Sequence, residues 1–138
     1  APAFDYTSLE GGAVASSRFA GQVVVVDFWA TWCAPCIEAL PALEALAQTF
    51  DGAPVSFVAL SLDEELDTVR QFFSRRDVRF RVGLATEGVA EAFSVQGIPS
   101  TFVLDQRGRV VAHHQGFEPS WVTSVTADLV RLLEAGLR

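Results

Sequence analysis

Two cysteines, Cys33 and Cys36, are the residues of this 138-residue chain whose type and spacing most clearly indicate chemistry. They form a C-x-x-C pair that follows an apolar, β-branched stretch and opens a stretch with helical spacing. The first turn of a helix carries free N–H groups and partial positive charge, which stabilise a thiolate. We therefore expect Cys33 to be the attacking nucleophile. Cys36, one turn further on, is expected to resolve the mixed disulfide that Cys33 forms with a substrate.

Other uses of a cysteine pair need residues that the chain does not supply. A disulfide framework uses more cysteines, scattered along the sequence, and a zinc ribbon or finger needs two further ligands at close spacing. The only histidines, His113 and His114, are neighbours in an expected strand, so their side chains point to opposite faces. We expect neither a metal nor another bound cofactor.

Composition narrows the class of protein further. The length suits one domain over residues 1–138, and a hydrophobic content of 50% argues against disorder. A formal charge of −7 repels phosphate backbones, so we expect no nucleic-acid partner. The valine run over residues 23–26 is far too short to cross a bilayer. We expect the protein to be a monomer.

The elements that must position the cysteines follow from hydrophobic periodicity. Apolar and alternating runs predict strands, and apolar residues three and four apart predict helices. The chain begins with a short hairpin over residues 4–14. Strands are expected over residues 22–30, 55–62, 80–84, 100–104 and 110–114, and helices over 33–50, 64–75, 87–93 and 120–133. This alternation predicts an α/β fold with a mainly parallel sheet, to which the late hairpin adds antiparallel strands.

Two segments resemble signatures of a known superfamily. The segment DFWATWCAPC, residues 27–36, closely resembles the active-site segment of thioredoxin-fold proteins. Gly97-Ile98-Pro99 resembles their second signature, a loop whose cis-proline faces the disulfide. The lead-in over residues 4–26 resembles the hairpin entry of the TlpA/ResA group, and residues 67–95 are long enough for that group's extra insertion. The resemblance implies a thioredoxin fold: a central mixed β-sheet flanked by helices, with an N-terminal β-hairpin and a β–α insertion.

The resemblance also implies two acidic site residues. Asp27 interrupts the valine run, where burial raises a carboxyl pKa, and it resembles the buried acid that moves the proton of the second cysteine in thioredoxins. Ala59 falls where thioredoxins often carry Lys, so we expect that contact to be absent. An acidic residue near the disulfide is expected at Glu64, or at Asp63 or Glu65 if the alignment shifts by one. The alternatives are a structural Asp27 and a solvated acidic helix start.

A docking patch for substrate is expected around the cysteines. The exposed face of Trp32 would lie beside Ile98 and Pro99, and the Ile98 backbone would pair with an extended substrate strand. Trp121 is expected to help dock the last helix. The full set of expected substrate-binding residues is Trp32, Ala34, Pro35, Gly97, Ile98 and Pro99.

Members of the resembled group are thiol–disulfide oxidoreductases that reduce disulfides in partner proteins, including apocytochromes awaiting haem. They work outside the cytoplasm, on the periplasmic or cell-surface side, often tethered to the membrane, and a chain that starts at Ala1 fits loss of a signal or anchor. The expected partners are protein thiols and disulfides and an upstream electron donor, such as a membrane thiol reductant.

Two rival functions remain. A thiol peroxidase is one, although peroxiredoxins carry their reactive cysteine in a loop motif without C-x-x-C. The other is a non-catalytic binding module, against which the intact Cys33, Cys36 and Pro99 argue.

Overall fold

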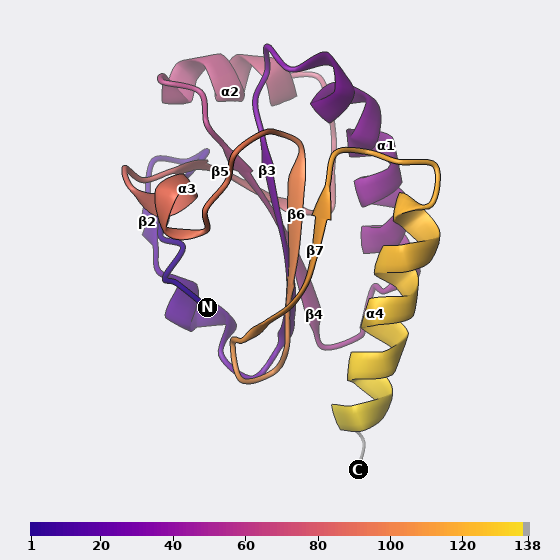
Figure 1. The fold of residues 1–138 in the computed structure, drawn as a ribbon. Coiled ribbons are helices and arrows are strands. Elements are labelled where there is room, and N and C mark those ends of the chain that lie inside the picture. Colours follow the sequence, from indigo (N-terminus) through magenta and orange to yellow (C-terminus); the bar gives the residue numbers. More distant parts are fainter. Residues whose placement is uncertain (137–138) are drawn as a thin grey trace.

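The computed structural model, which describes residues 1–136, is built on one mixed sheet with strand order β2-β1-β5-β4-β3-β6-β7 (Figure 1). Its strands are β1 (Tyr6–Ser8), β2 (Ala13–Val14), β3 (Val23–Trp29), β4 (Val55–Ser61), β5 (Arg81–Ala85), β6 (Ser100–Leu104) and β7 (Val110–Gln115). The helices are the 3₁₀ turn η1 (Ser16–Phe19), α1 (Ala34–Thr49), α2 (Leu66–Phe73), α3 (Val89–Ala92) and α4 (Trp121–Gly136). The α/β fold predicted from the sequence is confirmed.

Strand β3 carries the cysteine-bearing helix and lies deep in the sheet. All seven of its residues are buried, which explains why its sequence is a run of valines rather than an alternating pattern. It pairs in parallel with β4 and antiparallel with β6. A strand held on both edges and both faces gives the following loop a rigid starting point.

Helices cover both faces of the sheet. Figure 1 shows α1 and α4 beside each other on one face and α3 on the other. Val25 and Trp29 of β3 pack into the core that includes α1, α2 and α4, whereas Val26 and Phe28 pack with Phe93 after α3. Alternate residues of β3 therefore belong to different layers, and Asp27 falls on the α1 and α4 side.

The segment between α2 and β6 contains the expected β–α insertion, made of β5 and α3. Strand β5 lies parallel to β4 and antiparallel to β1, so it joins the N-terminal hairpin to the sheet. The close approach of β1 needs a glycine, since a Cβ at Gly83 would lie 2.1 Å from the ring of Tyr6.

Two helices are shorter than the sequence predicted. Helix α2 begins at Leu66, because the preceding Glu65 has the extended backbone of a cap residue (φ −118°, ψ 130°). Glu64 therefore lies in the loop after β4, outside the helix. Helix α3 is a single turn of four residues, Val89–Ala92.

Candidate functional site

The cysteine pair lies where β3 passes into α1. Cys33 is the N-cap of α1, and its Sγ accepts a hydrogen bond of 3.3 Å from the backbone N–H of Cys36. Pro35 occupies the first turn, where its missing N–H leaves no bond unmade. The two cysteines form a disulfide with their Cα atoms 5.2 Å apart. Cys33 is 7% exposed and Cys36 is fully buried, so only Cys33 can be approached from solvent.

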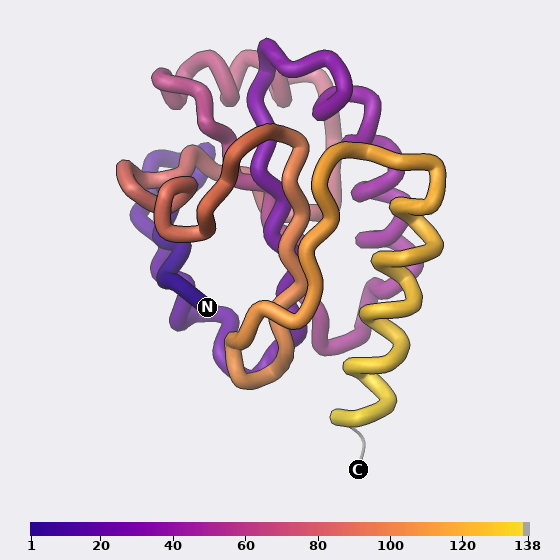
Figure 2. The backbone as a smooth tube through the Cα atoms, in the orientation of Figure 1, coloured from indigo at the N-terminus to yellow at the C-terminus, as the bar shows by residue number. Residues whose placement is uncertain are grey.

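The loop before β6 faces this disulfide. The Ile98–Pro99 peptide bond is cis, and Sγ of Cys33 lies 3.8 Å from the carbonyl oxygen of Ile98. Figure 2 traces this orange loop and the purple start of α1 to the same end of the molecule. Two segments about 65 residues apart in sequence thus meet at one site.

The residues predicted to bind substrate surround the pair with different exposures. Trp32 is 71% exposed, which is unusual for an indole and leaves its face free for contact. Ala34 and Pro35 are also exposed, Gly97 and Ile98 are half-buried, and Pro99 is buried. The contact between Cys33 and Ile98 brings together the two segments that carry these residues, and their role in binding stays a prediction.

Asp27 is the buried acid of the site. It is 3% exposed and pairs in register with Ala59 of β4 and Thr101 of β6. Burial raises its pKa from 3.8 to about 7, against the opposing effect of a hydrogen bond of 3.0 Å from the Thr101 hydroxyl. With alanine at position 59, no lysine from β4 lies beside the carboxyl.

Of the three acidic residues that the sequence offered, Asp63 is the one that contacts the active-site loop, at Thr31. The carboxylate of Asp63 accepts the backbone N–H of Thr31 at 3.0 Å and the Thr31 hydroxyl at 2.7 Å. The Ser61 hydroxyl is its third donor. Glu64 and Glu65 are exposed, because the loop after β4 turns their side chains to solvent. A catalytic role for Glu64 has no contact to support it.

Sequence reasoning missed the link of Thr101 and Trp121 to Asp27. Thr101 donates to its carboxylate, and the indole N–H of Trp121 donates to the Thr101 hydroxyl at 3.2 Å. A signal was present for Thr101, a polar residue in an apolar strand two positions after Pro99. Recognising it required the pairing register of β3 and β6.

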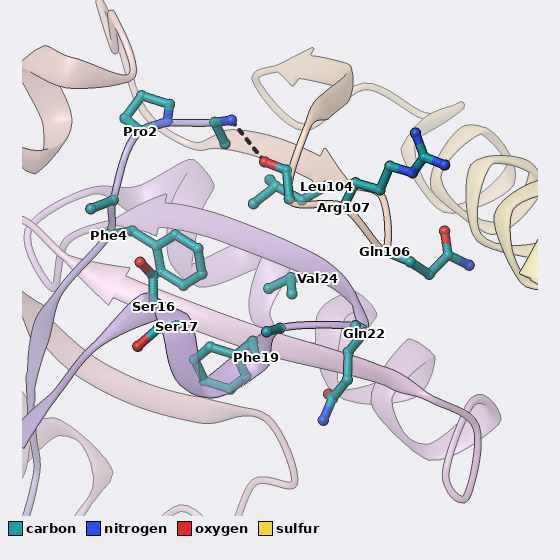
Figure 3. Close-up of a pocket in the computed structure, with 15 residues that line it drawn as sticks. Pro2, Phe4, Ser16, Ser17, Phe19, Gln22, Val24, Leu104, Gln106 and Arg107 are labelled. Atoms are coloured by element: carbon teal, nitrogen blue, oxygen red, sulfur yellow. Dashed lines mark hydrogen bonds between the residues drawn. The ribbon is translucent and has the colours of Figure 1, made fainter.

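Other features of the described chain lie away from the cysteine pair. Residues 1–136 contain no group of three or more His, Cys, Asp or Glu side chains that could hold a metal ion. A cavity of about 400 Å³ lies at the opposite end of β3, between the N-terminal segment and the β6–β7 turn (Figure 3). Phe4, Phe19 and Val24 contribute to its lining, which holds no cysteine, histidine or carboxylate side chain.

Within residues 1–136, no helix has the length and apolar character to span a membrane.

Comparison with known proteins identifies the family. The family model described as Redoxin matches residues 1–129. The chain is 32% identical over 117 residues to the thiol-disulfide oxidoreductase ResA of Bacillus thuringiensis, covering 84% of this chain and 68% of that protein. It is 30% identical over 137 residues to ResA of Bacillus subtilis, covering 99% of this chain and 75% of that one.

Solved structures agree with the sequence relatives. A thiol:disulfide interchange protein of the thioredoxin family from Chlorobium tepidum superimposes with a TM-score of 0.82 at 26% identity, covering 96% of this chain and 94% of that chain. Its fold is therefore shared over nearly the whole length of both chains. The chain belongs to the Redoxin family, as a ResA-like member of the thioredoxin superfamily.

Proposed function

We propose that this thiol–disulfide oxidoreductase reduces disulfide bonds in partner proteins, with Cys33 as the nucleophile. The observation that carries the proposal is the unequal burial of the pair at the start of α1. Cys33 caps the helix and is 7% exposed, whereas Cys36 is 0% exposed behind it. An entering disulfide can reach only the first sulfur, which the helix terminus stabilises as a thiolate.

In the reduced protein, the Cys33 thiolate attacks one sulfur of the substrate disulfide and displaces the other as a thiolate. The resulting mixed disulfide joins Cys33 to the substrate. Cys36 then loses its proton and attacks Sγ of Cys33, which releases the second substrate sulfur and forms the Cys33–Cys36 disulfide. Two electrons pass from the dithiol to the substrate, and an upstream thiol donor must return them.

Asp27 is the proposed acceptor of the Cys36 proton. A carboxyl with a pKa of about 7 is divided between its acid and base forms at neutral pH, as a general base for a thiol requires. It lies on the face of β3 that packs against α1, in the same layer as Cys36. Glu64, which is exposed, has no part in this scheme.

Substrate docking is assigned to the surface around Trp32 and the Ile98–Pro99 loop. An extended peptide laid along this loop would form backbone hydrogen bonds with Ile98 and place its disulfide against Cys33. The exposed indole of Trp32 supports a role in apolar contact with the peptide. The remaining residues of the proposed patch are Ala34, Pro35, Gly97 and Pro99.

The proposed setting is outside the cytoplasm, where disulfides form and persist and a dedicated reductant has substrates. Support comes from the TlpA/ResA-like lead-in and from the ResA relatives. Apocytochromes are proposed as substrates and a membrane thiol reductant as the donor, on the same resemblance. The protein is proposed to act as a monomer.

The test uses Cys36→Ser, which blocks resolution, with Cys33→Ser as the matched control. The reduced C36S protein should form a stable mixed disulfide with a disulfide-bonded protein such as insulin, and C33S should not. The wild type should reduce insulin with dithiothreitol as donor. Peroxide consumption faster than insulin reduction would favour a thiol peroxidase instead, and inactivity in both assays would favour a binding module.

A further inference from the structure

A chain of buried hydrogen bonds links the last helix to the acid of the active site. The indole N–H of Trp121 in α4 donates to Oγ1 of Thr101 in β6 at 3.2 Å. The same hydroxyl donates to Oδ1 of Asp27 in β3 at 3.0 Å. The three residues are buried, with exposures of 3%, 0% and 3% in that order, so water competes little for these bonds.

The chemistry of the three groups fixes which one donates in each of these hydrogen bonds, from Trp121 through Thr101 to Asp27. An indole N–H can only donate, so one lone pair of the Thr101 oxygen is occupied by Trp121. The Thr101 proton is then directed to Oδ1 of Asp27. An oxygen that accepts this bond is a poor place for a proton. The second oxygen, Oδ2, receives no side-chain hydrogen bond from residues 1–136 and is the one that can take up and release a proton.

The other elements around Asp27 bring no charge to it. Ala59 is its neighbour on β4, Thr101 is its neighbour on β6, and α4 contributes the neutral Trp121. Helix α1 packs on the same face of β3 and carries Cys36, whose thiol titrates when the disulfide is reduced. The carboxyl of Asp128 in α4 forms hydrogen bonds with His114 and Arg131 instead. Thr101 is therefore the polar group through which the described fold can act directly on the Asp27 carboxyl.

We propose that Thr101 and Trp121 are positioning residues that reserve Oδ2 of Asp27 for proton exchange with the Cys36 thiol. The proposal rests on the proposed role of Asp27 as proton acceptor. Thr101 stabilises the carboxylate by donating to it, and Trp121 strengthens that donation by polarising the hydroxyl. The pair keeps the carboxyl able to ionise near neutral pH in spite of its burial.

Thr101→Val is the direct test, because valine has the shape of threonine without the hydroxyl. A hydrogen bond to a charged group contributes enough that its loss should raise the Asp27 pKa by about one unit or more. The measurement is the ¹³C shift of the Asp27 carboxyl against pH in the oxidised protein, where no thiol titrates. Thr101→Ser keeps the hydroxyl and is the matched control, with a pKa near that of the wild type.

Trp121→Phe tests the outer bond and should raise the Asp27 pKa by less than T101V does. In the double variant T101V/W121F, the second change should add nothing, because Trp121 acts only through Thr101. Should T101V fail to fold, W121F alone must still shift the pKa upward. An unchanged pKa in T101V, an equal shift in T101S, or full additivity in the double variant would overturn the proposal.

The same variants separate this inference from the proposed function. In the reduced protein, the pH dependence of insulin reduction should move upward by the same amount as the carboxyl titration. If the Asp27 pKa shifts but the pH dependence of insulin reduction does not, Asp27 is not the proton acceptor. That result would also refute the proposal that Oδ2 is reserved for Cys36. An unmoved titration in a protein whose rate depends on Asp27 would refute only the roles of Thr101 and Trp121.

Discussion

Replacing Asp27 with Asn should stabilise the oxidised protein, by an amount that depends strongly on pH. The carboxyl is buried in an apolar layer, and burial raises its pKa from 3.8 to about 7. A raised acid pKa means that ionising Asp27 is harder in the folded protein than in the unfolded chain. Asparagine keeps an oxygen that can accept the Thr101 hydrogen bond and never ionises, so it removes this cost.

The magnitude follows from the two pKa values. The unfolded chain releases the Asp27 proton near pH 4, and the folded protein holds it until about pH 7. Between these values the folded state binds more protons than the unfolded state, so the free energy of unfolding falls as the pH rises. The rise in the pKa from 3.8 to about 7 corresponds to a loss of about 4 kcal/mol in the free energy of unfolding across this window, and the loss stays constant above it. D27N should therefore match the wild type at pH 4 and exceed it by about 4 kcal/mol at pH 8.

Denaturant unfolding of both oxidised proteins at pH 4, 6 and 8 measures this difference. Asp105→Asn is the control of opposite sign. Burial alone would raise the Asp105 pKa, but hydrogen bonds from Arg109 and Arg107 lower it overall. D105N, unfolded in the same way at pH 6 and at pH 3, should lose stability near neutral pH, and that loss should shrink as the pH falls below about 4. A D27N difference that is the same at all three pH values would refute the assignment of a raised pKa to Asp27.

Three further outcomes are expected at the active site. D27N should slow the reduction of insulin near neutral pH while the fold, followed by circular dichroism, stays intact; an equal rate at every pH would leave Asp27 a structural residue. Alkylation of the reduced protein should titrate Cys33 well below the ~8.5 of a free thiol, with Cys36 higher, whereas equal and unshifted reactivity would contradict the nucleophile assignment. Asp63→Ala should free Thr31, lower the stability by about 2 kcal/mol and slow insulin reduction, whereas Glu64→Ala, the matched neighbour, should change neither.

The position of the cysteine pair was predictable because its signals are local. A valine run marks a strand buried on both faces, and apolar residues three and four apart mark the helix that follows. The structure places these elements at Val23–Trp29 and Ala34–Thr49, within a few residues of the expected bounds. The burial of Asp27 could be predicted for the same reason, since it lies inside the strand that the valine run marks as buried on both faces.

The position of the second acid was not predictable in this way. Whether Asp63 or Glu64 turns toward the site depends on the path of the loop after β4. That path places Asp63 against Thr31, which is 32 residues away in sequence. Both residues are acidic and both precede a helix, so composition and periodicity describe them equally well. The choice is made by two hydrogen bonds between separate segments, which no local pattern contains.

The role of Trp121 was also beyond prediction from local sequence patterns, because it depends on contacts between separate segments. The sequence indicated an aromatic residue that docks the last helix, and its burial to 3% exposure agrees with that interpretation. Its indole nitrogen, however, meets Thr101, and Thr101 meets Asp27 only because β6 pairs with β3 in a register that sets those two residues opposite each other. A shift of that register by one residue would turn Thr101 to the other face of the sheet. The property assigned to the active-site acid thus depends on strand pairing and on helix docking together, and each is settled by the packing of the whole chain.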